Sequence, residues 1–234
     1  MFVFAPFFIL SAWLGSAPAW AMQPNGCPDF RQPEVTIHQL VVAPRFNDTF
    51  NLTNIKRLAM EGGQTITSPQ HETPVGITAA SLKLETRYEV NITTLPGDPM
   101  VCAQISNLHL NFGFDDTTVY IAREIPFRSC SYQTVLSHEM KHVRTDRLLV
   151  ENTASLLPFY LKKALNQIGV IRASSGSTAE RQLKYLIERY MQELGANLSA
   201  VRRKQQSTID TREEYDRISS CCNGALSEII RSRH

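Results

Sequence analysis

The sequence predicts an α+β protein in which a small antiparallel or mixed sheet is followed by one long helix and further C-terminal helices. Two observations carry this prediction. Runs rich in β-branched and aromatic residues, some with alternating apolar and polar positions, occur in the first half of the chain. From residue 131 onward, apolar residues recur every three or four positions, as on one face of a helix. We therefore expect one domain over residues 22–234, strand-rich over 22–130 and helical over 131–234.

Individual elements follow from these patterns and from the residues that interrupt them. The expected strands cover residues 34–42, 81–93, 100–112 and 117–125. The sequence Leu-Pro-Gly-Asp-Pro at 95–99 separates the second strand from the third, because Pro and Gly favour a turn. In the second half, the apolar periodicity predicts two long helices, over 132–165 and 178–204.

The first 21 residues have the features of a secretory signal peptide. They contain no charged side chain, and residues 2–14 form an apolar run that only Pro6 interrupts. Ala19-Trp20-Ala21 is a small-residue cleavage site of the A-x-A type, so we expect cleavage after Ala21. The rest of the chain shows no second candidate for a membrane span. These features predict a secreted or periplasmic protein.

The charge balance argues against a nucleic-acid partner. The chain has 24 Lys and Arg against 22 Asp and Glu, a formal net charge of +2, and its basic residues are spread along the sequence. The exception is the short run Arg202-Arg203-Lys204, which we interpret as a solvated helix face. The sequence leaves the oligomeric state open.

Export to an oxidising compartment makes disulfides the expected state of the cysteines. The five cysteines are Cys27, Cys102, Cys130, Cys221 and Cys222. We expect Cys102 to pair with Cys130, and Cys27 to pair with Cys221 or Cys222. The remaining cysteine is then either free or a metal ligand.

The strongest motif in the chain is His138-Glu139-Met140-Lys141-His142, which has the form H-E-x-x-H. On a helix, residues four apart lie on one face, about 6 Å apart along the axis, so two imidazoles can bind one Zn²⁺. The Glu between them can then act as general base on a zinc-activated water. The alternative is a surface helix that carries two His and a Glu by coincidence.

Helical spacing places this motif opposite an apolar stripe. At about 100° per residue, the stripe is formed by Leu136, Met140, Val143 and Val150. It is expected to bury in the core, while His138 and His142 face a cleft or solvent. Ser131 is the expected N-cap of this helix.

A zinc site of this type needs a third protein ligand. Asp146 is too far along a straight helix, so we interpret it as a residue that orients His142 by accepting its N–H, or as an exposed partner of a neighbouring Arg. Glu213 is the first candidate for the third ligand and Glu188 the second. The helix carboxylate Glu193 is a further candidate, whereas Thr211-Arg212-Glu213-Glu214 fits a capping box that already gives Glu214 a structural role. Tyr215 could stabilise an oxyanion or simply pack.

Several stretches resemble one group of proteins. They are Val-Tyr-Ile-Ala-Arg-Glu at 119–124, Ser-Cys-Ser-Tyr at 129–132, Val-Leu-Ser-His-Glu-Met-Lys-His at 135–142 and Ile-Asp-Thr-Arg-Glu-Glu-Tyr at 209–215. The group consists of bacterial envelope proteins of uncharacterised activity with a zincin-like motif, and the wider likeness is to zinc metallopeptidases. The resemblance implies a zincin-like fold, with His138 and His142 as ligands and Glu139 as base. It also implies that the strand ahead of the motif helix lines the cleft, where substrate backbone adds to its edge.

The expected function is therefore that of a zinc-dependent hydrolase, most of all a metallopeptidase acting on a peptide or protein. The rival hypothesis is a non-catalytic envelope protein that binds a partner through its two long helices. Its metal site would be structural or vestigial. A closed site with four protein ligands, including Cys221 or Cys222, would favour the rival, and three ligands with an open position would favour the enzyme.

Overall fold

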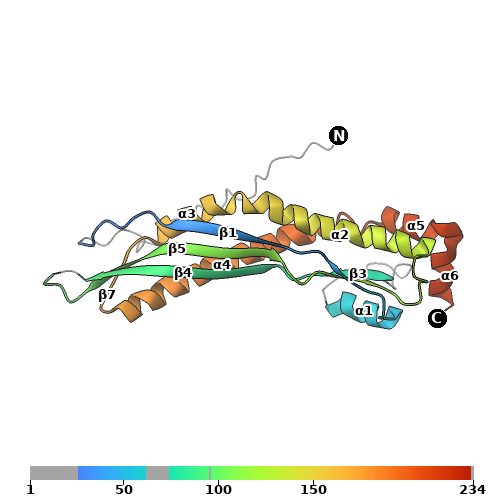
Figure 1. Ribbon diagram of the computed structural model, residues 1–234, viewed down its shortest axis with the longest axis horizontal. Coiled ribbons are helices and arrows are strands. Elements are labelled where there is room, and N and C mark those ends of the chain that lie inside the picture. The colour runs from blue at the N-terminus through green and yellow to red at the C-terminus, as the bar shows by residue number, and fades with distance from the viewer. Residues whose placement is uncertain (1–25, 62–73, 95, 233–234) are drawn as a thin grey trace. The chain divides into compact units, whose positions relative to one another are not determined.

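The computed structural model describes residues 26–61, 74–94 and 96–232, so the expected signal peptide lies outside the described residues. Figure 1 shows the order of the helices and strands. In chain order they are β1 (Glu34–Val41), β2 (Arg45–Asn47), α1 (Leu52–Glu61), β3 (Gly76–Ala79), β4 (Lys83–Thr94), β5 (Val101–Phe114), β6 (Thr118–Ile121), α2 (Cys130–Ala154), α3 (Leu157–Ile168), β7 (Ile171–Ala173), α4 (Gly176–Gln206), α5 (Arg212–Ser220), the 3-10 helix η2 (Cys222–Gly224) and α6 (Ala225–Arg231). The α+β class is confirmed, and all four expected strands are present as β1, β4, β5 and β6.

The strands form two sheets. One has the order β1-β5-β4, with β7 also paired antiparallel to β5, and the other has the order β2-β6-β3. In the second sheet, β6 runs parallel to β2 and antiparallel to β3. Since β6 has a neighbour on each side, it has no free edge, and the expectation that substrate adds to the edge of the 117–125 strand is wrong.

The expected single helix over 132–165 is two helices. The motif helix α2 ends at Ala154, and α3 begins at Leu157. Pro158 explains the break, because it lacks the N–H that would bond to the Ala154 carbonyl and its ring clashes with that carbonyl in a continuous helix. At the other end, Ser129 caps α2 by accepting from the Tyr132 N–H, so the expected cap at Ser131 is wrong by two residues.

The chain forms two compact units, each built from three stretches. The first unit contains the described residues up to Thr36 together with Arg87–His109 and Pro158–Met191. The second contains Ile37–Thr86, Leu110–Leu157 and the described residues from Gln192 onward. Each unit has both strands and helices, so the expected boundary at residue 130 does not coincide with the division into units.

In the first unit, a disulfide and a short strand stabilise the N-terminal half of β5. Cys27 is bonded to the fully buried Cys102, and β7 pairs with β5 from Val101 opposite Ala173. Arg172 of β7 forms an ion pair with Asp98 in the turn before β5. The chain ahead of β1 is thereby covalently tied to a strand about 75 residues later.

The second unit is organised around α2, which packs against β3 and β6. Helix α1 lies on β3 (Figure 1). The apolar core beneath these elements consists of Leu52, Ile55, Ala59, Ile77, Val119, Ile121, Ala122, Ile125, Tyr132, Val135, Ile218 and Leu226. The face of α2 that carries the two His is the buried face, with Val135 and Leu149 beside them. From the expected apolar stripe, only Val150 is fully buried, whereas Leu136, Met140 and Val143 are partly exposed and pack at the core's margin.

The expected disulfide pairing is wrong. Cys130, the first residue of α2, bonds to Cys222 rather than to Cys102. Cys221 carries the free thiol. Pairing by nearness in the sequence failed because the start of α2 lies beside the segment that follows α5, 92 residues later. Of the two vicinal cysteines, one is bonded and one is spare, as the sequence predicts.

Among the described helices, none is both long enough and apolar enough to cross a membrane.

Candidate metal centre

Helix α2 brings the three motif side chains to one buried face. His138, Glu139 and His142 are only 5%, 4% and 7% exposed. An exposed coincidental motif would leave these polar side chains in water, where polar groups prefer to be. Their burial requires partners, and each of the three has one on a different element of the second unit.

The two imidazoles meet a carboxylate that sequence reasoning did not select. Asp210 lies in the short connection between α4 and α5. Its Oδ1 atom is 3.3 Å from His138 Nε2 and 3.2 Å from His142 Nε2, and the two Nε2 atoms are 3.3 Å apart. These three atoms form a nearly equilateral triangle, and the three residues could hold a metal ion.

The triangle has the size of one face of a tetrahedral zinc site. Zinc ligands at about 2.0–2.1 Å in a tetrahedron lie about 3.3–3.4 Å from one another. The donor set of two imidazole nitrogens and one carboxylate oxygen also suits zinc. The three residues line a cavity of about 40 Å³ together with Glu139 and Tyr215. This volume holds at least one water molecule, so the fourth side of such a site is open to a small ligand.

Glu139 is held against β3, a strand that the sequence did not predict. Thr78 donates from Oγ1 to the Glu139 carboxylate at 2.8 Å. Gly76 allows the strand to approach this closely, since an added Cβ would lie 2.7 Å from Val135 Cγ1 and 2.8 Å from Glu139 Oε1. Burial raises the pKa of Glu139, although the positive charges of His142 and His138 oppose the shift.

The electrostatics of the triangle favour a cation. Burial of Asp210 opposes its ionisation, but the hydrogen bonds from His138 and His142 outweigh burial and hold its pKa well below the ordinary value. Burial similarly opposes charge on His142, yet the hydrogen bond to Asp210 and the charge of Glu139 raise its pKa to about 9. The two shifts have one cause: the Asp210 carboxylate and the His142 ring each stabilise the charged form of the other.

His142 has a buried supporting network. Its Nδ1 lies 2.6 Å from Gln206 Oε1, and the Gln206 amide donates to Asp146 Oδ1 at 2.6 Å. Arg202 donates to both Asp146 oxygens, at 2.7 and 2.8 Å, and its guanidinium lies over the Phe114 ring. The interpretation of Asp146 as direct acceptor for His142 is thus wrong, because Gln206 lies between them. The solvated-face interpretation of Arg202 is wrong as well, although Arg203 and Lys204 are exposed.

His138 has a different, charged partner. Its Nδ1 is 3.3 Å from Glu214 Oε1, and Glu214 also accepts two hydrogen bonds from Arg217 and one from Lys141. The hydrogen bonds from Arg217 are the main reason that the pKa of Glu214 is held well below its usual range. Thr211 caps the Glu214 N–H as predicted, but the Glu214 side chain points to His138 instead of completing the capping box.

We refer to these two sets of side chains as the two arms of the site. The His138 arm consists of His138, Glu214, Arg217 and Lys141. The His142 arm consists of His142, Gln206, Asp146 and Arg202. Both arms lie entirely within the second unit.

The structure does not bring the expected third ligands to the triangle. Glu213 is exposed on the outer side of α5, and Glu188 is exposed and paired with Lys184. Asp210 replaces them because it lies just ahead of the Thr211 N-cap, where the chain turns back toward α2. Tyr215 donates to Asp210 Oδ1 at 3.2 Å, and burial together with the Asp210 charge raises its pKa. Asp210 and Tyr215 both lie within the stretch 209–215, which resembles the bacterial group, so that resemblance was the sequence signal that could have identified Asp210 as a ligand.

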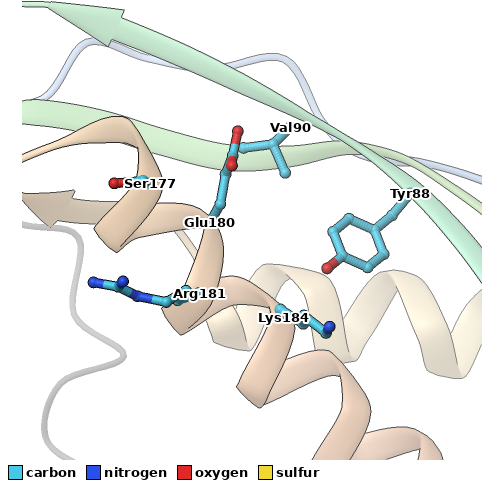
Figure 2. Close-up of a pocket in the computed structure, with 6 residues that line it drawn as sticks. All are labelled: Tyr88, Val90, Ser177, Glu180, Arg181 and Lys184. Carbon is cyan, nitrogen blue, oxygen red and sulfur yellow. The ribbon is translucent and has the colours of Figure 1, made fainter.

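A second cavity, of about 460 Å³, lies in the first unit between β4 and α4 (Figure 2). It is lined by Tyr88, Val90, Ser177, Glu180, Arg181 and Lys184. Figure 2 shows the Glu180 carboxylate directed toward Val90, while Arg181 and Lys184 extend away from each other. Among the described residues, no group of three or more metal-binding side chains lies there, so its larger volume does not make it the candidate site.

Comparisons with protein-family models, curated proteins and solved structures find no match to this chain. The candidate site therefore rests on its geometry and chemistry alone.

Proposed function

We propose that this protein is an exported zinc-dependent hydrolase, a metallopeptidase that acts on peptides or proteins. The observation that carries the proposal is the triangle of His138 Nε2, His142 Nε2 and Asp210 Oδ1, with a buried Glu139 lining the same cavity. Three protein ligands with an open fourth side are the pattern of catalytic zinc sites, whereas structural sites are closed by four.

In this proposal, His138, His142 and Asp210 hold the ion. Bound zinc supplies Lewis acidity, which polarises a carbonyl and makes water a stronger acid. Glu139 accepts the proton of the attacking water and passes it to the leaving amine. Its burial supports this role, because a raised pKa brings a carboxylate closer to the pH at which it must both take and give a proton. Thr78 fixes one oxygen of that carboxylate and so sets its direction.

The rival hypothesis of a closed structural site loses its cysteine ligands. Cys222 is bonded to Cys130, and the Cys221 thiol lies 3.9 Å from an Arg217 nitrogen. Neither residue lines the cavity beside the triangle. The two disulfides fit an oxidising compartment, which supports a secreted or periplasmic location.

The experiment that tests the proposal measures metal first and hydrolysis second. The protein, produced under oxidising conditions, should contain about one zinc per chain, as a three-ligand site requires. His138→Ala should lose the zinc, and Glu139→Gln should keep it. A peptide library should then be cleaved by the wild type and not by Glu139→Gln. A folded, disulfide-bonded wild type that binds no added zinc contradicts the proposal, and so does cleavage that survives in Glu139→Gln.

A further inference from the structure

Gln206 makes contacts that a merely structural glutamine does not need. Its Oε1 faces His142 Nδ1 at 2.6 Å, and its amide nitrogen donates both to Asp146 Oδ1 at 2.6 Å and to the His142 carbonyl at 3.2 Å. All the polar atoms of this side chain are thus directed at His142 and at the residue one turn further along α2. Gln206 is the last residue of α4, only four residues before Asp210.

The orientation of the Gln206 amide determines the tautomer of His142. A neutral imidazole carries its proton on one ring nitrogen only. Because an amide oxygen only accepts, Nδ1 facing Oε1 must carry that proton when His142 is neutral, as a metal ligand must be, and the Nε2 lone pair is then available to the ion. Nε2 is the atom that belongs to the triangle with His138 and Asp210.

Asp146 in turn determines the orientation of the amide. A flipped Gln206 would place its oxygen against Asp146 Oδ1, and two acceptors at such a distance repel each other. Arg202 keeps Asp146 in place by donating to both of its oxygens. Asp146 is only 3% exposed, and burying a charged pair gives little net stability, so its position calls for a reason other than stability.

We propose that Gln206 is a positioning residue for the metal centre, which together with Asp146 and Arg202 holds His142 in the tautomer that presents Nε2 to the ion. The inference rests on the proposed zinc site and extends it to residues that touch no ion. Its consequence is that zinc affinity depends on Asp146, although the Asp146 side chain bonds to Gln206 and Arg202 and, among the described residues, not to His142 or the triangle.

The test is the equilibrium affinity for zinc, measured by competition with a chelator and accompanied by the visible spectrum of the cobalt-substituted protein. Gln206→Leu removes the acceptor, and Asp146→Asn removes the carboxylate at nearly constant volume. Each should weaken zinc binding about 10- to 100-fold, the usual effect of losing an outer partner of a metal-binding His. Gln192→Leu, which changes an exposed glutamine on the same helix, should leave the affinity unchanged.

A double substitution separates positioning from structural support. In Gln206→Glu/Asp146→Asn, the carboxylate and the amide exchange places, so an oxygen can again accept from His142 Nδ1–H while the new amide donates to it. We expect this pair to recover most of the affinity that Asp146→Asn or Gln206→Glu loses alone, with the tetrahedral cobalt spectrum restored. A purely structural role would instead lower the melting temperature of the metal-free protein and leave the zinc affinity of the folded protein unchanged.

The outcomes distinguish this inference from the proposed function. If wild type and Gln206→Leu bind zinc equally well, the inference is overturned and the zinc site stands. If Asp146→Asn and the double variant are equally weak, the exchange of roles is disproved and the positioning argument with it. If the folded wild type binds no zinc, both the proposed function and this inference fail.

Discussion

The two arms of the site hold chemically identical ligands by opposite means. His142 is supported by a neutral amide, behind which Asp146 and Arg202 form a paired and mostly buried set. His138 is supported directly by the Glu214 carboxylate, whose charged partners Lys141 and Arg217 are nearly half exposed. Both partners accept a hydrogen bond from Nδ1–H of a neutral imidazole, so in the zinc-bound state both leave the Nε2 lone pair to the same ion.

The difference indicates that one arm fixes the geometry of the site and the other supplies charge. A buried network excludes water and is hardly screened by salt, so it fixes one arrangement of atoms. An exposed ion-pair network adds negative charge near the ion but is screened and individually weak. We infer that the His142 arm determines the geometry of the site, whereas the His138 arm mainly adjusts its electrostatic potential.

Removal of Asp210, which contacts the histidine of each arm, should have the largest effect. Asp210 contacts both Nε2 atoms, so Asp210→Ala leaves two nitrogens without the anion that completes the triangle. We expect zinc content to fall from about one per chain to near zero, because two-ligand sites are not the pattern of stable zinc binding. The measurement is metal analysis after dialysis against a weak chelator. Asp216→Ala, an exposed aspartate on α5, is the matched control and should keep its zinc.

Removal of the Cys130–Cys222 disulfide, near the His138 arm, should have the next largest effect. Cys130 begins α2 and Cys222 begins η2, so this disulfide joins the helix that carries His138 to the residues that follow α5, the helix that carries Glu214. Cys130→Ser/Cys222→Ser should lower the free energy of unfolding by about 2–5 kcal/mol, as loss of a native disulfide does. Chemical denaturation measures this change. Cys221→Ser serves as control and should leave the free energy of unfolding unaltered. Equal stability of the wild type, the double variant and this control would contradict a stabilising role of the disulfide.

The sequence predicted the parts of the site that lie on one element. The spacing of His138, Glu139 and His142 on a helix is local, because the α-helical repeat alone fixes which residues share a face. Which face of α2 is buried depends instead on contacts with residues far away in the sequence. Gly76 and Thr78 of strand β3 lie against the face of α2 that carries the motif. The periodicity of apolar residues in α2 does not predict this contact.

The residues of other elements that contact the motif could not be predicted from helical periodicity, for a physical reason. Asp210, Gln206 and Arg202 reach α2 only because α4 and α5 return to it in space, more than 50 residues later in the chain. Their own sequence context is ordinary for a helix end, and Arg202 lies in a basic run that favours solvent. What the sequence did offer was the resembling stretch that contains both Asp210 and Tyr215. Within that stretch, the capping box assigned a structural role to Glu214 and left Glu213 as the first candidate, but Glu213 is exposed on α5.

Neutralising the charge of the His138 arm should give the smallest effect and the sharpest contrast. Glu214→Gln keeps an oxygen that accepts from His138 Nδ1 but removes the negative charge near the ion. We expect zinc affinity to fall less than about tenfold, and the deficit to shrink as salt rises, because salt screens the charge that the wild type contributes. The measurement is zinc affinity at low and high ionic strength, with Gln206→Leu measured alongside. The Gln206→Leu deficit should be nearly independent of salt, since that arm is buried. If Glu214→Gln instead shows the larger loss, unaffected by salt, then the His138 arm fixes the geometry and the assignment of the two arms is reversed.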